Sequence, residues 1–137
     1  MLTKVYSLQA KDGLPIYDSR VAAAIACLVE LYRQQKQLSW KCVPSELVFP
    51  VLDQRSIRTV KGLTENLIVG SHTRMDRKNT QQWVSASIKL GWIMQAVLDK
   101  ASNLFADQKS RLHAFEASLF MMGYDVGSLK SNLPKHK

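Results

Sequence analysis

The residues best suited to chemistry stand around Asp18, directly before an apolar stretch of the chain. The segment reads Leu14-Pro15-Ile16-Tyr17-Asp18-Ser19-Arg20-Val21-Ala22, so a carboxylate lies close to a phenol and a guanidinium in the sequence. A carboxylate at the start of a helix is stabilised by free backbone N–H groups and by the helix dipole. A negative charge held in this way can stabilise a cationic transition state or orient a nucleophile. Asp18 is therefore our candidate catalytic residue, and an enzyme site built from Asp18, Tyr17 and Arg20 is one hypothesis for the chain.

Asp18 also has a purely structural interpretation. Asp is a favoured N-cap residue, because its side chain accepts hydrogen bonds from the first N–H groups of a helix, and such a cap contributes about 1 kcal/mol. Both interpretations put Asp18 at the beginning of a helix. The sequence does not separate them, so we keep both.

A second set of candidate residues lies between positions 53 and 78, the least periodic part of the chain. Its positive residues outnumber its acids, and we predict that they bind nucleic acid: Arg55, Arg58, Lys61, Arg74, Arg77 and Lys78. The whole chain has 19 Lys and Arg against 11 Asp and Glu, a net charge of +8. Such a field attracts phosphate polyanions. There are two alternative reasons for this charge. It can attract an acidic protein partner, or it can keep a small protein soluble.

Other chemistry is not indicated by the sequence. There is no phosphate-cradling glycine-rich loop, Cys-x-x-Cys or His-Glu-x-x-His, and His72, His113 and His136 are scattered. We therefore expect no metal and no cofactor. Cys27 and Cys42 form no pattern, and the first residues do not resemble a secretory signal, so we expect reduced thiols and a cytoplasmic protein. The longest apolar run, Val21–Val29, is too short to cross a bilayer, so we expect no membrane partner.

The segment around Asp18 resembles a known family. An Asp at the start of an apolar helix, after a turn that contains Pro, is similar to the Asp-x-x-Val step of the helix-hairpin-helix DNA glycosylase superfamily, and the string Ile16-Tyr17-Asp18-Ser19-Arg20-Val21 is most similar to its divergent 8-oxoguanine-glycosylase-like branch. In that superfamily the aspartate lies beside the lesion pocket and assists departure of the damaged base. The resemblance implies this role for Asp18 alone, because the superfamily's glycine-containing hairpin has no counterpart before it.

Three apolar stripes predict the helices that position these residues. The first helix begins at Asp18-Ser19, ends at Arg33–Lys36, and has one apolar face made of Val21, Ile25, Leu28 and Tyr32. The longest helix begins at Asn79 or Thr80, and its stripe consists of Trp83, Ala86, Leu90, Ile93 and Val97. Trp92 falls on the opposite side from Trp83, so only one of them is expected in the core.

The last predicted helix begins at Asp107 or Gln108 and ends at Met122, and we expect Gly123 to follow it as a left-handed C-cap residue. Its stripe consists of Leu112, Phe115, Leu119 and Met122. Pro44-Ser45-Glu46 predicts a short helix that Pro50 limits. Tyr17 and Trp40 lie in or near predicted loops and can stack on bases there, although aromatic residues more often pack in a core.

Together these patterns predict one all-α domain over residues 1–137, a compact bundle of roughly four to six helices with a frayed tail from about residue 128. The function expected of it is that of a nucleic-acid-associated domain that resembles part of a DNA glycosylase fold, with or without activity of its own. A protein-interaction or regulatory domain with an acidic partner is the alternative.

Overall fold

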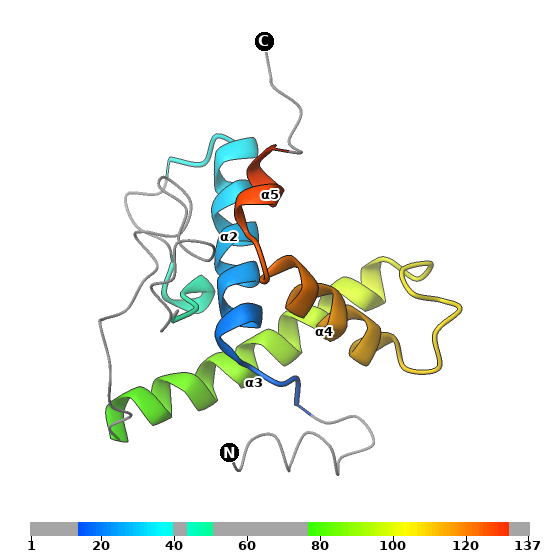
Figure 1. Cartoon of the computed structure of the whole chain (residues 1–137), viewed down its shortest axis with the longest axis horizontal. Coiled ribbons are helices and arrows are strands. Elements are labelled where there is room, and N and C mark those ends of the chain that lie inside the picture. Colours follow the sequence, from blue (N-terminus) through cyan, green and yellow to red (C-terminus); the bar gives the residue numbers. More distant parts are fainter. Residues whose placement is uncertain (1–13, 40–43, 51–76, 132–137) are drawn as a thin grey trace.

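The computed structural model describes residues 14–39, 44–50 and 77–131 (Figure 1). Within these ranges the chain forms helices and no strand, which confirms the predicted all-α class. The elements are α2 (Ser19–Gln35), the short 3-10 helix η1 (Ser45–Leu47), α3 (Arg77–Lys100), α4 (Arg111–Met122) and α5 (Gly127–Ser131). No helix in these ranges has the length and apolar character needed to cross a bilayer.

Helix α2 is the centre of the fold. In Figure 1 it stands across the long helix α3, and α4 packs against both of them. Every residue from Val21 to Cys27 is buried, so the helix is covered on all sides. The sequence predicted only one buried face. The difference arises from the alanines of this stretch, whose small side chains let neighbouring elements approach from several directions. Tyr32, predicted on the buried face, is 51% exposed.

Helix α3 contributes a long apolar stripe to the core. Its fully or almost fully buried side chains recur every four residues at Ala86, Leu90, Met94 and Leu98. Trp83 is partly buried against the core, whereas Trp92 is 71% exposed, as their spacing predicted. The helix begins at Arg77, before the predicted start at Asn79 or Thr80. Arg and Lys are good helix formers, so they extend the helix beyond the polar residues that the sequence offered as caps.

Helix α4 begins later than predicted, at Arg111 and not at Asp107 or Gln108, and Ser110 is its N-cap. The Arg111 guanidinium donates hydrogen bonds to the carbonyl oxygens of Leu98, Ala101 and Leu104, at 2.9, 2.7 and 2.9 Å. These bonds hold the connection after α3 in a non-helical shape. Phe105, with a φ of 56°, is also in the left-handed region that a right-handed helix excludes.

Gly123 is the C-cap of α4, as predicted. Its backbone is in the right-handed region, with a φ of −75°, so the prediction of a left-handed conformation was wrong. The buried face of α4 is also narrower than the predicted stripe, because Met122 is 36% exposed. After Gly123 the chain continues into α5, and the buried Val126 joins the core. Helix α5, Gly127–Ser131, thus occupies the first residues of the segment that the sequence analysis expected to be frayed.

The short helix predicted at Pro44-Ser45-Glu46 is confirmed as η1. It leads into the fully buried Phe49 and the buried Pro50. This segment covers one side of the core, next to α3. It also supplies a backbone carbonyl that helps to hold the start of α2 in place.

Candidate functional site

Asp18 is the N-cap of α2. Its Oδ1 atom accepts hydrogen bonds from the backbone N–H groups of Arg20 and Val21, both at 2.9 Å. These two amides and the positive end of the helix dipole stabilise the negative charge of the carboxylate. The structural interpretation of Asp18 is thus confirmed. It does not exclude the catalytic one, because the side chain is only partly buried.

The segment before Asp18 is fixed by contacts with other parts of the fold. The indole Nε1 of Trp83 donates to the Tyr17 carbonyl oxygen at 2.7 Å, and the Ser87 hydroxyl donates to the Pro15 carbonyl oxygen at 2.9 Å. Both donors come from α3. Residues remote in sequence therefore determine where Asp18 lies.

Tyr17 belongs to the core and not to a binding surface. It is 5% exposed, its hydroxyl donates to the Pro50 carbonyl oxygen at 3.0 Å, and its ring lies edge-on to Trp83 at 4.7 Å between centroids. Burial raises the pKa of Tyr17 far above its ordinary value. Tyr17 therefore cannot stack on a base or act as an acid in this fold, which agrees with the core interpretation of its aromatic ring.

Arg20 points to the far end of α4. Its guanidinium carbon lies 4.5 Å from the ring centroid of Phe120 and 5.3 Å from that of Tyr124. Both are cation–π distances. Arg20 thus ties the first turn of α2 to α4, and the proposed grouping of Asp18, Tyr17 and Arg20 around one site is not seen in the structure.

A cavity of about 330 Å³ opens beside Asp18, between the start of α2 and α4. We call it the Asp18 cavity. Its lining combines apolar groups with three titratable ones, and consists of Ile16, Asp18, Val21, His113, Glu116, Ala117 and Phe120. Its size lies at the lower end of the range for small-molecule sites, roughly 300–1,000 Å³.

Glu116 is the functional candidate that the sequence analysis missed. Its Oε1 atom accepts a hydrogen bond from the Ile16 N–H at 3.2 Å. Burial is the main reason that the pKa of Glu116 is raised, and the negative charge of Asp18 acts in the same direction. The Ile16 N–H and His113 act against this shift without cancelling it. The signal for Glu116 was present, because it lies four residues after Leu112 and three before Leu119 on the apolar side of α4.

The Asp18 cavity thus joins two carboxyl groups in different surroundings: Glu116, whose pKa burial raises, and Asp18, whose Oδ1 atom accepts from two backbone amides. Enzymes that cleave glycosidic bonds use two carboxyl groups whose environments differ in this sense, one as a proton donor and one as a nucleophile or charge stabiliser. Phe120 adds an aromatic side chain to the wall, and the Arg20 guanidinium lies over one face of its ring. Among the described residues no group of His, Cys, Asp and Glu is placed to hold a metal ion.

The predicted nucleic-acid-binding residues are divided by the limits of the described ranges. Arg77 and Lys78 form the first turn of α3. Arg55, Arg58, Lys61 and Arg74 lie outside the described residues, as does Trp40. The arrangement of these four basic residues relative to the Asp18 cavity therefore stays a prediction.

Comparison with known proteins adds no relative. No family model matches the chain, and neither the curated proteins nor the solved structures contain a significant match.

Proposed function

We propose that this chain is a nucleic-acid-associated helical domain that resembles part of a DNA glycosylase fold, and that its Asp18 cavity receives a nucleobase. One observation carries the proposal. Asp18, the residue to which the glycosylase resemblance assigns a role, lies in the wall of a cavity together with a second carboxyl group, Glu116.

The charge of the chain supports the same function. With a net charge of +8, the protein attracts phosphate groups over long distances. The two carboxyl groups of the Asp18 cavity do not oppose this, because an extruded base presents N–H donors and not phosphates to its pocket. Extrusion of a base costs a few kcal/mol in lost stacking, which contacts with the flipped base and the strand must offset.

The reaction that suits this cavity is hydrolysis of the bond between a base and its sugar. The C1′–N bond breaks, the base leaves with the electron pair and takes up a proton, and water adds to C1′ with loss of a proton. The Asp18 carboxylate stabilises the positive charge that develops on the sugar. Activity of this chain by itself is one form of the proposal, and base binding without cleavage is the other.

Measurement of binding to labelled duplex and single-stranded DNA over a range of salt concentrations tests the proposal. We expect binding at low salt and a steep linear fall of log K with log salt, because bound counterions are released when phosphates are neutralised. Absence of binding to either DNA at low salt would overturn the proposal. In that case an acidic protein partner becomes the preferred explanation of the charge.

A further inference from the structure

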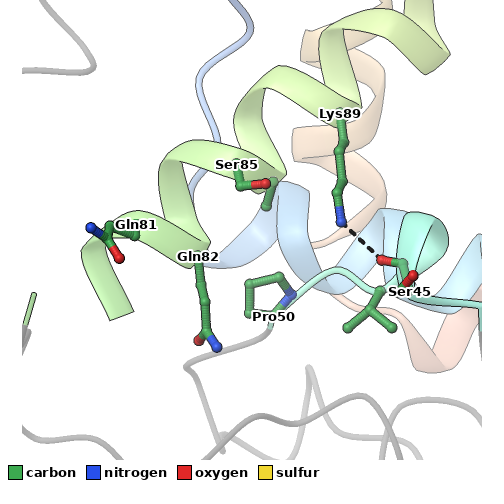
Figure 2. Close-up of a pocket in the computed structure, with 8 residues that line it drawn as sticks. Ser45, Pro50, Gln81, Gln82, Ser85 and Lys89 are labelled. Atoms are coloured by element: carbon green, nitrogen blue, oxygen red, sulfur yellow. Dashed lines mark hydrogen bonds between the residues drawn. The ribbon is translucent and has the colours of Figure 1, made fainter. Parts of the chain in front are cut away.

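A second cavity, of about 430 Å³, lies between α3 and the segment of η1 and Pro50 (Figure 2). We call it the α3 cavity. Val48, Pro50 and Ala86 give it apolar walls. Its polar lining residues are Ser45 of η1 and four residues on one side of α3, which are Gln81, Gln82, Ser85 and Lys89. The function considered so far makes no use of this cavity.

The polar side of α3 follows a regular spacing. Gln81, Ser85 and Lys89 are four residues apart, so they lie one above the other along the helix. The same spacing leads back to Arg77, and Gln82 leads back in the same way to Lys78. Two of the predicted nucleic-acid-binding residues therefore stand one helical repeat before Gln81 and Gln82 in the sequence.

Lys89 supplies the positive charge of the α3 cavity. Its Nζ atom donates to the Ser45 carbonyl oxygen at 2.8 Å, as Figure 2 shows, and this bond uses one of the three donors of the ammonium group. Glu46 is the acidic neighbour. Its pKa is lowered mainly by hydrogen bonds from its own backbone and from the Ser45 side chain, and Lys89 adds to this effect. Glu46 does not line the cavity, and among the described residues that do, Lys89 is the charged one.

We propose that the α3 cavity, with the polar side of α3 that lines it, binds one strand of nucleic acid, with Lys89 on a phosphate. Amide and hydroxyl groups such as those of Gln81, Gln82 and Ser85 bond to phosphate, sugar and base edges. The apolar wall of Val48 and Pro50 packs against a sugar or a base. This inference rests on the proposed function, since it says where on the surface the nucleic acid lies.

The test compares two substitutions in the α3 cavity with matched substitutions elsewhere. Lys89→Gln removes the charge from the cavity, and Lys109→Gln removes the same charge from an exposed position in the loop between α3 and α4. Ser85→Glu places a negative charge in the cavity, and Ser102→Glu places one in the same distant loop. All four side chains are on the surface or partly exposed, so thermal unfolding is expected to show that each variant folds.

We expect Lys89→Gln to reduce the steepness of log K against log salt by about 0.9 for duplex or about 0.7 for single-stranded DNA, the value for one lost phosphate contact. The loss of affinity should be similar for different base sequences. Ser85→Glu should weaken binding more than Ser102→Glu, and Lys109→Gln should leave the slope unchanged.

The failure of this inference differs from the failure of the proposed function. If the wild-type protein binds DNA but each cavity variant behaves like its matched control, the α3 cavity is not the binding surface and the proposed function stands. If the wild-type protein does not bind DNA at low salt, both are overturned.

Discussion

Gly123 and Arg20 touch through their backbones where α4 ends against the first turn of α2. A Cβ atom on residue 123 would lie 1.9 Å from the Arg20 carbonyl oxygen and 2.9 Å from its Cα. The obstacle is backbone, which cannot turn aside as a side chain can. Glycine is therefore required here by a close approach of two helices, although its φ is one that any residue adopts.

Gly123→Ala should destabilise the fold by about 2 kcal/mol or more, since overpacked sites typically cost 1–3 kcal/mol and here the backbones must separate. The midpoint of urea unfolding measures the loss. Gly127→Ala is the matched control, because the atom nearest to its added Cβ, at 3.1 Å, belongs to the Asp125 side chain, which can move. Equal midpoints for the wild type and Gly123→Ala would show that the two helices do not meet as described.

Arg111→Lys should lower the free energy of unfolding by about 1–3 kcal/mol, the range for hydrogen bonds to charged groups. Arg111 bonds to three carbonyl oxygens, one in the last turn of α3 and two in the connection after it. A lysine has no planar fork of donors that could reach all three. Chemical denaturation measures this difference. Lys109→Arg, two residues earlier and exposed, is expected to change nothing, and an equally small effect at Arg111 would show that its hydrogen bonds do not hold the connection after α3.

Asp18→Asn separates the two roles of Asp18. Asn is as good an N-cap as Asp, so the variant should keep nearly the wild-type stability while losing the negative charge. If Asp18 is catalytic, the rate at which free base is released from DNA should fall by orders of magnitude. Chromatography of the released base measures this rate. Asp18→Ala should in addition cost about 1 kcal/mol of stability. Wild-type rates of base release in Asp18→Asn would leave Asp18 with the capping role alone.

The raised pKa of Glu116 predicts how stability depends on pH. The folded protein holds this proton to a higher pH than the unfolded chain does, so Glu116 makes the fold less stable as pH rises from about 4.3, the usual glutamate value, through the folded-state pKa. Glu116→Gln removes the titration and keeps an oxygen that can accept from Ile16. The stability of the wild type relative to Glu116→Gln should therefore be lower at pH 7 than at pH 4.

Urea unfolding of both proteins at the two pH values measures this difference. His113→Gln is a useful third variant, because His113 also lines the Asp18 cavity and lowers the pKa of Glu116. Its loss should extend the titration of Glu116 to higher pH. A relative stability that stays constant or increases between pH 4 and pH 7 would contradict the burial of the Glu116 carboxyl.

Sequence predicted the parts of this fold that local chemistry determines. The start of α2 was correct because the Asp18 side chain bonds to the next two amides in the chain. The core stripe of α3 was largely correct because its spacing follows the helical repeat. The predicted start of α4 was wrong because Arg111 bonds to carbonyl oxygens up to 13 residues earlier in the chain. Sequence spacing does not reveal these bonds.

The candidate site was predictable only in part, for the same reason. Asp18 has a local signature. Glu116 acquires its environment from Ile16, 100 positions away, and no pattern within α4 predicts that partner. An acidic residue on the apolar side of a helix was nevertheless a usable signal, because a carboxyl group placed there must be either paired or kept protonated.

The buried hydroxyl of Tyr17 lies between residues of the two cavities. It bonds to Pro50, which lines the α3 cavity, while the next residue in the chain, Asp18, lines the other cavity. One hydrogen bond and one peptide unit thus link a wall residue of one cavity to a wall residue of the other. We therefore expect a ligand that displaces Pro50 to break the hydrogen bond of the Tyr17 hydroxyl, one residue before Asp18.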